Sequence, residues 1–332
     1  MRGWSLPRRV RALRATVSLL LLQTLLVQAL PARAVSLYEQ PRYAAFLIDA
    51  DTGEVLYSRQ ADAERYPASI TKVMTLYILF ERLAAGQVGL DDRITFSARA
   101  AAQRPSKLGL KAGQSLTVDE AIRALATKSA NDVAVAIAEH VAGSEARFGQ
   151  LMTLRARQLG MTKSQFVNPS GLPDPRQVTS ARDIATLSLA MLRDFPQYYG
   201  YFQLQQFSFQ GRVMPNHNHL LRTMPGVDGI KTGFTNAAGF TLAASAVRDN
   251  RRLVAVVLGG PTRVARDSNV ETLLSSGFAV LAARRSGGRV QVADLLSEPG
   301  DLNDALLSTL VEQGSSDDMG AGRPGKAPRA RD

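Results

Sequence analysis

The sequence, 332 residues long, contains no cysteine. Disulfide bonds, a thiolate nucleophile and cysteine-based zinc sites are therefore excluded, and the absence suits an oxidising compartment, where stray thiols are a hazard. A repeat of about 20 to 50 residues is also lacking, which argues against a solenoid or a propeller. What is present is a 45% share of apolar residues, enough for one large buried core or two.

The positive charge is concentrated at one end of the chain. The net charge is +11, and residues 1–34 hold six arginines and no acidic residue. Without them, 34 basic and 29 acidic residues remain, an excess of only +5. No stripe of Lys and Arg with interleaved aromatic residues is left, so we expect no nucleic-acid partner.

Residues 1–34 have the pattern of a signal peptide. A basic stretch precedes the apolar run of residues 15–30, and the sequence then reads Pro-Ala-Arg-Ala, similar to a cleavage site. The run is short for a membrane span, and no later run is long enough. We therefore predict cleavage near Ala34, export to the periplasm and no stable membrane anchor. An uncleaved N-terminal anchor is the alternative.

The rest of the chain combines strand and helix patterns. Residues 43–49 and 55–58 are apolar runs on either side of a turn with Asp and Gly, which predicts a β-hairpin. Residues 67–80 predict a helix that is apolar almost all round and therefore buried. Further helices are expected over residues 118–127, 132–141, 145–159, 179–192 and 269–283, and strands over residues 242–247 and 253–258. This order predicts an α+β fold, with an antiparallel sheet covered by helices and an inserted helical subdomain.

Three short motifs carry residues suited to chemistry. In the first, Ser69 and Lys72 lie three positions apart and share one face of the predicted helix. A buried lysine with a lowered pKa can take the proton of a serine hydroxyl, and the N-terminus of a helix offers N–H groups to an oxyanion. In isolation, such a pair is more often a helix cap followed by a solvated lysine.

The second and third motifs are also weak in isolation. Ser129 and Asn131 lie between two helical stretches, where they face a cleft or simply cap the next helix. Lys231, Thr232 and Gly233 lie at the start of a predicted strand. Their cation and hydroxyl suit a carboxylate, and the glycine leaves room for a ligand along the backbone. A turn with a surface lysine is the alternative for this third motif.

Together and in this order, the motifs resemble those of the low-molecular-mass penicillin-binding proteins, the serine D-alanyl-D-alanine carboxypeptidases. The middle motif departs from the usual Ser-Asp-Asn, because Ala130 replaces the aspartate. The resemblance runs from residue 43 to residue 283 and includes the segments 166–172, 180–183, 228–235 and 238–240. It implies a β-lactamase/transpeptidase-like fold and a penicillin-binding D,D-peptidase domain over residues 35–285.

The resemblance also implies a role for each motif residue. Ser69 would be the acylated nucleophile, Lys72 its general base and Ser129 a proton shuttle. The backbone N–H groups of Ser69 and Phe234 would form the oxyanion hole, and neither a metal nor another cofactor is needed. The residues that would bind the substrate are Asn131, Lys231, Thr232, Gly233 and Phe234.

The implied reaction is that of a D,D-carboxypeptidase, which removes the terminal D-Ala from peptidoglycan stem peptides. β-Lactam antibiotics are then expected as covalent inhibitors. A D,D-endopeptidase that cuts peptidoglycan cross-links with the same residues is the alternative. A β-lactamase is less favoured, because class A enzymes deacylate with a loop glutamate, and Asp174 is the only acidic residue between residues 168 and 182. Three intact motifs disfavour a wall-binding protein without activity.

The C-terminal region departs from the family pattern. About 50 residues follow residue 283, too few for the additional β-domain that members of the family often carry. We expect a short extension over residues 286–313, with an acidic helix that anionic lipids repel, and a disordered tail over residues 314–332. His217 and His219 lie shortly before the third motif, where they either contact the substrate or are ordinary loop residues. A metal site at these two histidines would lack further ligands.

Overall fold

The computed structural model describes residues 42–296. The predicted signal peptide, the predicted acidic helix and the predicted tail lie outside the described residues. The limits proposed for the peptidase domain and for the C-terminal extension stay predictions. Among the described helices, none is both long enough and apolar enough to cross a bilayer.

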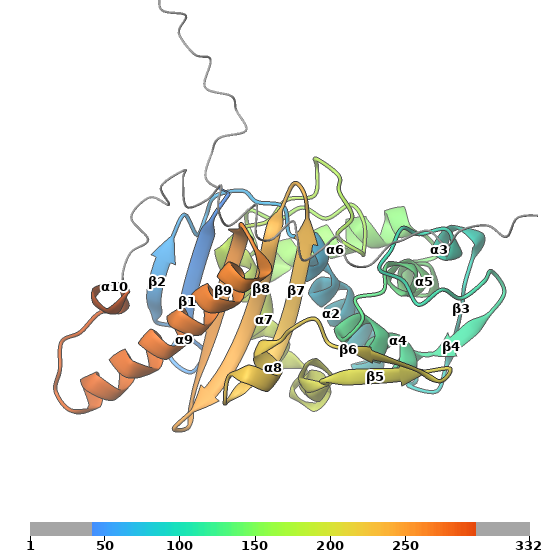
Figure 1. The fold of residues 1–332 in the computed structure, drawn as a ribbon. Helices are drawn as coiled ribbons and strands as arrows, with labels where there is room; N and C mark the ends of the chain where they lie inside the picture. Colours follow the sequence, from blue (N-terminus) through green and yellow to red (C-terminus); the bar gives the residue numbers. More distant parts are fainter. Residues whose placement is uncertain (1–41, 297–332) are drawn as a thin grey trace, which may run out of the picture. The chain divides into compact units, whose positions relative to one another are not determined.

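A five-stranded antiparallel sheet forms the centre of the fold (Figure 1). Its strands follow the order β2–β1–β9–β8–β7, so β7 lies at one edge. The predicted hairpin and the two predicted strands are confirmed, and β8 and β9 run beyond their predicted ends because pairing continues to Phe240 opposite Gly260. The strands are β1 (Ala44–Asp49), β2 (Val55–Arg59), β7 (Val227–Thr235), β8 (Gly239–Arg248) and β9 (Arg251–Gly260).

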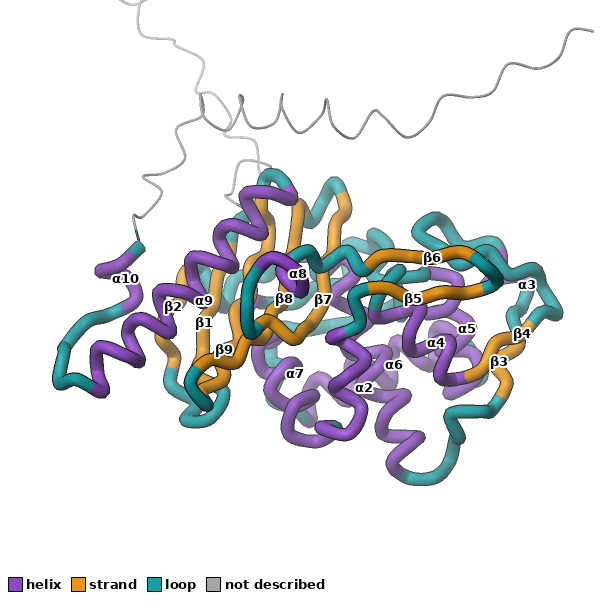
Figure 2. Tube along the Cα trace, turned by 60° about the horizontal axis from the view of Figure 1, so that its bottom comes forward, coloured by secondary structure: helices purple, strands orange, loops and turns teal. Residues whose placement is uncertain are grey.

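Helices cover both faces of this sheet (Figure 2). Helix α9 (Arg263–Arg285) packs on one face against β8 and β9, and α7 (Ala181–Asp194) packs on the other against β1 and β9. Side chains alternate along each strand, so Phe46 of β1 joins the core on the α7 side while Leu47 joins the core beneath α9. The inner strand β1 is consequently buried throughout.

The first predicted helix differs from its expected form at its start. Residues Ala68–Ile70 form a short 3₁₀ helix, η1, and the α-helix α2 follows over Thr71–Ala84. Ser69 therefore lies in the 3₁₀ turn and not within a continuous α-helix from residue 67. Ala68 has a φ of 48°, a left-handed conformation that an α-helix does not accommodate.

Helix α2 and the helices that follow it, α3 to α6, form a lobe beside the sheet (Figure 1). Helix α2 is almost completely buried because α4, α5, α6 and α7 pack around it. The predicted helices of the lobe are confirmed to within one or two residues. The elements are α3 (Ala98–Ala101), α4 (Val118–Ala126), α5 (Asn131–Ala142) and α6 (Glu145–Gln158), with the short strands β3 (Arg93–Thr95) and β4 (Ser115–Thr117).

Helix α9 begins six residues before its predicted start. The side chain of Thr262 accepts a hydrogen bond from the backbone N–H of Ala265 and thus caps the helix. Most residues of the first two turns are polar, so the apolar periodicity does not reveal this part of the helix. Smaller elements without a prediction are η2 (Pro196–Gln203), β5 (Gln206–Phe209), β6 (Arg212–Pro215), α8 (Leu220–Thr223) and α10 (Val292–Leu295).

The burial of β1 generates a stability prediction. Phe46 is 1% exposed, so Phe46→Ala leaves a cavity in the core and is expected to lower the free energy of unfolding by about 3–5 kcal/mol. Val213→Ala on β6, where the side chain is 59% exposed, serves as the control and is expected to change it by less than about 0.5 kcal/mol. Urea titration checks both, and similar losses in the two variants would contradict the assignment of the core.

Candidate active site

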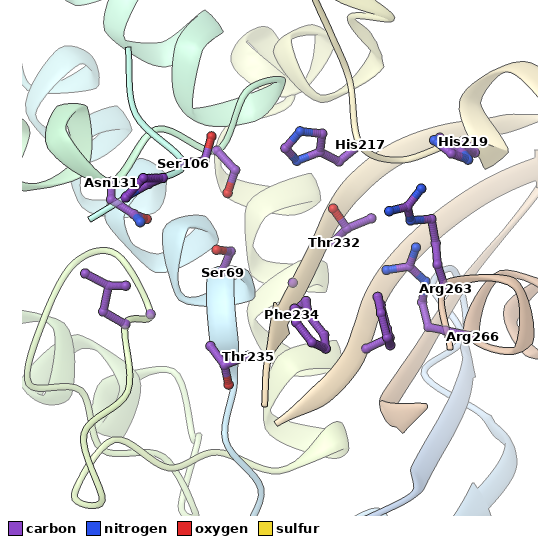
Figure 3. Close-up of a pocket in the computed structure, with 16 residues that line it drawn as sticks. Ser69, Ser106, Asn131, His217, His219, Thr232, Phe234, Thr235, Arg263 and Arg266 are labelled. Atoms are coloured by element: carbon purple, nitrogen blue, oxygen red, sulfur yellow. The ribbon is translucent and has the colours of Figure 1, made fainter. Parts of the chain in front are cut away.

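A cleft of about 330 Å³ opens where the edge strand β7 faces η1 and the loop before α5 (Figure 3). The three sequence motifs meet there, although they lie far apart in the chain. Lys72 and Lys231 lie buried behind the cleft wall, at 0% and 2% exposure. The motif residues that line the cleft are Ser69, Ser129, Asn131, Thr232, Gly233 and Phe234.

Lys72 is placed to act on Ser69. Its Nζ lies 3.0 Å from Ser69 Oγ, 2.8 Å from Asn131 Oδ1 and 2.5 Å from the backbone oxygen of Ser170. The amide and carbonyl oxygens only accept hydrogen bonds. A neutral amine that donates its two N–H groups to them turns its lone pair toward the serine hydroxyl. This geometry suits transfer of the hydroxyl proton to Lys72.

The surroundings of the two buried lysines lower the pKa of both amines. Desolvation lowers the pKa of Lys72 well below its usual 10.5, and repulsion by Lys231 lowers it further, while Asp132 opposes the shift. Desolvation and the neighbouring charge of Arg266 lower the pKa of Lys231 to about 7. The downward shift of its pKa brings Lys72 closer to the unprotonated form that a general base requires.

Asn131 connects Lys72 with the cleft. The structure places it as the first residue of α5 and not on a loop, as its position between two helical stretches suggested. Its Oδ1 accepts from Lys72, its Nδ2 donates to the backbone oxygen of Arg104, and its backbone N–H donates to Ser106. One N–H of the side-chain amide therefore remains for a substrate.

Ser129 is held in a costly conformation. Its φ is 61°, and its side chain is only 4% exposed. Within the described residues, its Oγ is buried without a hydrogen-bond partner. Backbone strain and an unpaired buried hydroxyl both cost free energy and are typical of functional sites. A hydroxyl of this kind, facing the cleft, suits the relay of a proton.

Two glycines allow the backbone segments around Ser69 to meet closely. A Cβ atom on Gly233 would lie 2.8 Å from the backbone N of Ser69, so β7 passes directly beside the nucleophile. Gly171 has a φ of 83°, and a Cβ atom there would lie 1.8 Å from the backbone oxygen of Ala68. The backbone N of Ser69 thus lies at the edge of β7 just before Phe234, as a shared oxyanion hole requires.

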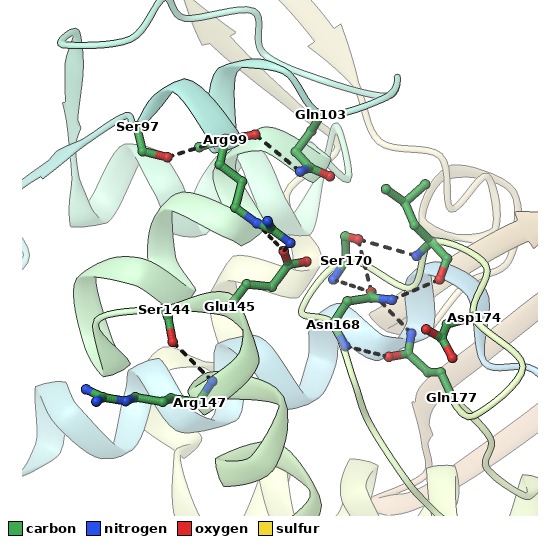
Figure 4. Close-up of polar contacts among 12 residues, drawn as sticks. Ser97, Arg99, Gln103, Ser144, Glu145, Arg147, Asn168, Ser170, Asp174 and Gln177 are labelled. Atoms are coloured by element: carbon green, nitrogen blue, oxygen red, sulfur yellow. Dashed lines mark hydrogen bonds and ion pairs between the residues drawn. The ribbon is translucent and has the colours of Figure 1, made fainter.

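Side-chain hydrogen bonds fix the loop that contains Ser170, whose backbone oxygen contacts Lys72 (Figure 4). Asn168 Oδ1 accepts from the backbone N–H groups of Ser170 and Gly171 and from the hydroxyl of Ser170. Gln177 Oε1 accepts in turn from the backbone N–H of Asn168. The loop thereby holds the backbone oxygen of Ser170 against Lys72. No sequence motif predicted this contact.

Basic side chains form one wall of the cleft, and the motifs do not include them. Arg263 and Arg266 reach it from the first turn of α9, and His217 and His219 from the loop before α8. Arg266 is 2% exposed and donates to the backbone oxygen of Thr241. Desolvation and nearby Lys231 lower the pKa of His217 to about 4, so its imidazole is neutral at neutral pH. The sequence did not decide whether the two histidines contact the substrate, and no motif in it pointed to the two arginines.

Acidic residues are absent from the part of the cleft lining that the structure describes. Asp174 lies outside this lining and forms an ion pair with Arg176, whose hydrogen bonds lower the pKa of the carboxyl to about 2. Within residues 42–296, no three His, Asp or Glu side chains cluster closely enough to hold a metal ion. The described lining of the cleft offers hydroxyl, amide, imidazole and guanidinium groups.

Comparisons with known proteins agree with this site. The profile of the D-alanyl-D-alanine carboxypeptidase family matches residues 34–262. The chain belongs to this family. D-alanyl-D-alanine carboxypeptidase DacF of Bacillus subtilis (strain 168) is 35% identical over 240 residues, which cover 71% of this chain and 62% of that protein. The chain thus spans less than two thirds of this curated relative.

Solved structures of the D-alanyl-D-alanine carboxypeptidase family and of penicillin-binding proteins share the fold. Penicillin-binding protein 5 from Haemophilus influenzae is 36% identical, with a TM-score of 0.69 and coverage of 71% of this chain and 70% of that chain. Penicillin-binding protein D2 from Listeria monocytogenes, in its cefotaxime-bound form, is 29% identical, with a TM-score of 0.65 and coverage of 71% and 96%. The predicted family and fold class are confirmed.

The lowered pKa values generate a prediction about pH. Acylation by a β-lactam needs Lys72 neutral, so its rate constant should rise as pH increases through the lowered pKa of Lys72. It should fall again as Lys231 loses its proton above about pH 7. Because arginine stays charged, Lys231→Arg should remove this fall at high pH. Second-order rate constants with a fluorescent penicillin between about pH 5 and 10 test both limbs; an unchanged basic limb in the variant would contradict the assignment.

The contact at Gly171 generates a second prediction. Gly171→Ala places a methyl group against the backbone of Ala68, displaces Ser69 and should lower the acylation rate constant by about two orders of magnitude. Gly160→Ala is the matched control, because Gly160 has a φ of 84° but nothing within 4 Å of a new Cβ. Both variants bear the backbone strain of about 1 kcal/mol. Equal acylation by the two variants would show that the contact does not position the nucleophile.

Proposed function

We propose that this protein is a serine D,D-carboxypeptidase that removes the terminal D-Ala from peptidoglycan stem peptides. The observation that carries the proposal is the environment of Lys72, whose Nζ lies 3.0 Å from Ser69 Oγ with two obligatory acceptors at its other contacts. This arrangement activates a serine without a histidine or a metal. Family membership and the cefotaxime-bound state of the Listeria monocytogenes relative support it.

In the acylation step, the substrate carboxylate binds between Thr232, which offers a hydroxyl, and Arg266 of the basic wall, with the charge of Lys231 just behind them. Ser69 Oγ attacks the carbonyl carbon of the scissile peptide bond and gives its proton to Lys72 Nζ. The oxyanion is stabilised by backbone N–H groups, and the C–N bond breaks. The leaving amine receives a proton from Lys72 through the hydroxyl of Ser129, and free D-Ala departs.

In the deacylation step, water attacks the ester on Ser69. Lys72, neutral again, takes a proton from the water, and the ester C–O bond breaks to restore the serine hydroxyl. A D-alanyl ester is small and leaves space for this water. A bulky β-lactam adduct does not, and no carboxylate lines the described cleft to activate a water elsewhere. We therefore propose β-lactams as slowly released covalent inhibitors, which disfavours the β-lactamase alternative.

A D,D-endopeptidase remains the second candidate because it uses the same catalytic residues. One observation favours it. The basic wall continues past Thr232 to Arg263, an exposed residue for which no ion pair or hydrogen bond is found among the described residues. A leaving group larger than D-Ala, with a further acidic group, fits such a wall. The carboxypeptidase has priority because the family is named for that activity.

We also propose that the mature protein acts in the periplasm. The basic stretch, the apolar run and the small-residue site of residues 1–34 support export followed by cleavage. Peptidoglycan stem peptides, the proposed substrate, lie in that compartment. The proposal includes no lasting membrane anchor once the signal peptide is removed.

Labelling tests the nucleophile and its base. Benzylpenicillin should add its mass to one peptide that contains Ser69, and Ser69→Ala should abolish the adduct. Ser106→Ala removes another hydroxyl from the same cleft and should keep it. Lys72→Arg should lower the acylation rate constant by about 10²–10⁴, because arginine does not deprotonate near neutral pH. Mass spectrometry checks the site, and an adduct on Ser69→Ala would overturn the assignment.

Turnover on the same preparation separates the three activities. We expect D-Ala release from a D-Ala-D-Ala pentapeptide to be faster than cleavage of cross-linked muropeptides and faster than decay of the penicilloyl adduct. Faster cleavage of the cross-linked substrate would establish the endopeptidase instead. Decay of the penicilloyl adduct as fast as peptide turnover would instead support the β-lactamase as the function of this protein.

A further inference from the structure

Two segments of the helical lobe and its neighbouring hairpin are basic without interruption. Residues 93–118 contain five basic residues and no acidic one. Their charge of +5 equals the excess that the whole chain carries after residue 34. Residues 195–227, which include the β5–β6 hairpin, also contain no acidic residue and add two arginines. Positive charge is therefore concentrated in these segments rather than spread over the fold.

Hydrogen bonds bring the two segments together. Arg212 on β6 donates from Nη2 to the backbone oxygen of Leu108 at 2.9 Å, so the hairpin lies beside the loop between α3 and β4 (Figure 2). From the other side, the carboxylate of Asp132 accepts the backbone N–H groups of Leu108 and Gly109. The backbone that carries the cations of this loop is thus held in place before any ligand binds.

Five cations from these segments and from the loop before α5 form a surface that we call the basic patch. Four of them are exposed, and Lys128 is half-buried. The neighbouring Arg99 and Arg123 have carboxylate partners, whereas within residues 42–296 no carboxylate forms an ion pair with a member of the patch. Like charges that are not neutralised repel one another, so the patch favours an anionic partner. Its members are Arg104, Lys107, Lys111, Lys128 and Arg212.

The basic patch is continuous with the catalytic cleft. Pro105 and Ser106 belong to the same loop and line the cleft. The hydroxyl of Ser106 donates to the backbone oxygen of Lys128 at 3.0 Å. The charge of Lys128 also reaches His217 in the cleft wall, where desolvation, Lys231 and Lys128 lower the pKa of the imidazole. A polymer with one end bound in the cleft can therefore extend over the patch within a region of positive potential.

The partner that fits this surface is a polymer with repeated carboxylates. Peptidoglycan is such a polymer, because its stem peptides carry free carboxylates along the glycan. Nucleic acid fits less well, since Phe96 is the only aromatic residue between residues 93 and 118 and is buried, which leaves no ring to stack on a base. A bilayer also fits less well, because Val213 is the only large apolar side chain of the two segments that is exposed.

We propose that the basic patch is a second contact surface for peptidoglycan, which binds carboxylates of the polymer outside the catalytic cleft and so favours polymeric over short substrates. The inference rests on the function proposed above. It concerns side chains that belong to none of the three motifs and that do not touch the reacting atoms.

Two substrates of different length test the proposal: an N-acetylated tripeptide that ends in D-Ala-D-Ala, and soluble glycan strands that carry pentapeptide stems. Lys107→Gln combined with Lys111→Gln removes two charges of the patch, and neither side chain lines the cleft. This patch variant should lower kcat/KM for D-Ala release from the strands by about three- to tenfold, the size expected of two exposed ion pairs. The kcat/KM for the tripeptide should stay unchanged.

A matched control removes two exposed cations elsewhere. Arg157→Gln combined with Lys163→Gln changes side chains at and after the C-terminal end of α6, where the backbone N–H of Lys163 binds Asp183. This control should leave both values of kcat/KM unchanged. An equal loss in the patch variant and the control, or a loss with the tripeptide as large as with the strands, would overturn the proposal.

Ionic strength provides an independent readout. An increase from about 0.1 to about 1 M shortens the Debye length from about 10 to about 3 Å. In the unmodified protein, kcat/KM for the strands should fall several-fold more than kcat/KM for the tripeptide, and the patch variant should reduce this difference. The same salt dependence for both substrates would contradict a charged contact outside the cleft.

Cosedimentation of the Ser69→Ala protein with insoluble peptidoglycan reports binding without turnover. The bound fraction should fall when the patch variant is added, and when the carboxylates of the peptidoglycan are converted to amides. Equal capture by phosphatidylglycerol vesicles, lost in the same variant, would identify a membrane as the partner and overturn the proposal.

The two assays separate this inference from the proposed function. If neither substrate releases D-Ala, the proposed function fails, and cosedimentation still decides the role of the patch. If D-Ala is released but the patch variant matches the control in both assays, the second contact surface is refuted and the proposed function stands.

Discussion

The burial of the Lys72 amine, with no charged group in contact with it, is the constraint on which the rest of this structure depends. All three groups within hydrogen-bond distance of Lys72 Nζ are neutral oxygens. Asp132, the acidic residue that opposes the shift in its pKa, uses its carboxylate on the backbone N–H groups of Leu108, Gly109 and Val133. Burial of the amine among neutral oxygens disfavours its charged form and so lowers the pKa of Lys72.

The parts of the fold that surround this amine are arranged to keep its three neighbours in place. Helix α2 carries Lys72 through a densely packed interior, and the first residue of α5 supplies the amide of Asn131. The loop around Asn168 is held by its own side-chain hydrogen bonds and presents the oxygen of Ser170. Each neighbour comes from a different segment, so the base is correctly oriented only in the complete fold.

The sequence indicated the side chains that we propose to be catalytic, but it did not indicate the backbone groups that position them. Ser69 and Lys72 were identified because their residue types and spacing have a chemical meaning in combination with the later motifs. The oxygen of Ser170 was missed because a carbonyl group is present in every residue and has no signature.

The sequence also gave no sign of backbone conformations that depend on contacts with distant segments. The 3₁₀ turn at Ser69 follows from the left-handed Ala68 and its close contact with Gly171, a hundred residues away, which no local propensity encodes. Arg266 was missed because it lies in the mostly polar first two turns of α9, before the apolar periodicity that predicted the rest of that helix.

The position of β7 at the margin of the sheet has a consequence for solubility. One row of its main-chain groups has no neighbouring strand in the described fold, and η1 covers part of it. Where a strand edge of this kind is exposed, it favours association between molecules. A bound peptide would pair there as a sixth strand, the mode known as β-augmentation. If the proposed substrate binds in this way, the same unpaired main-chain groups serve substrate binding and self-association, and a ligand that occupies them would suppress self-association while it is bound.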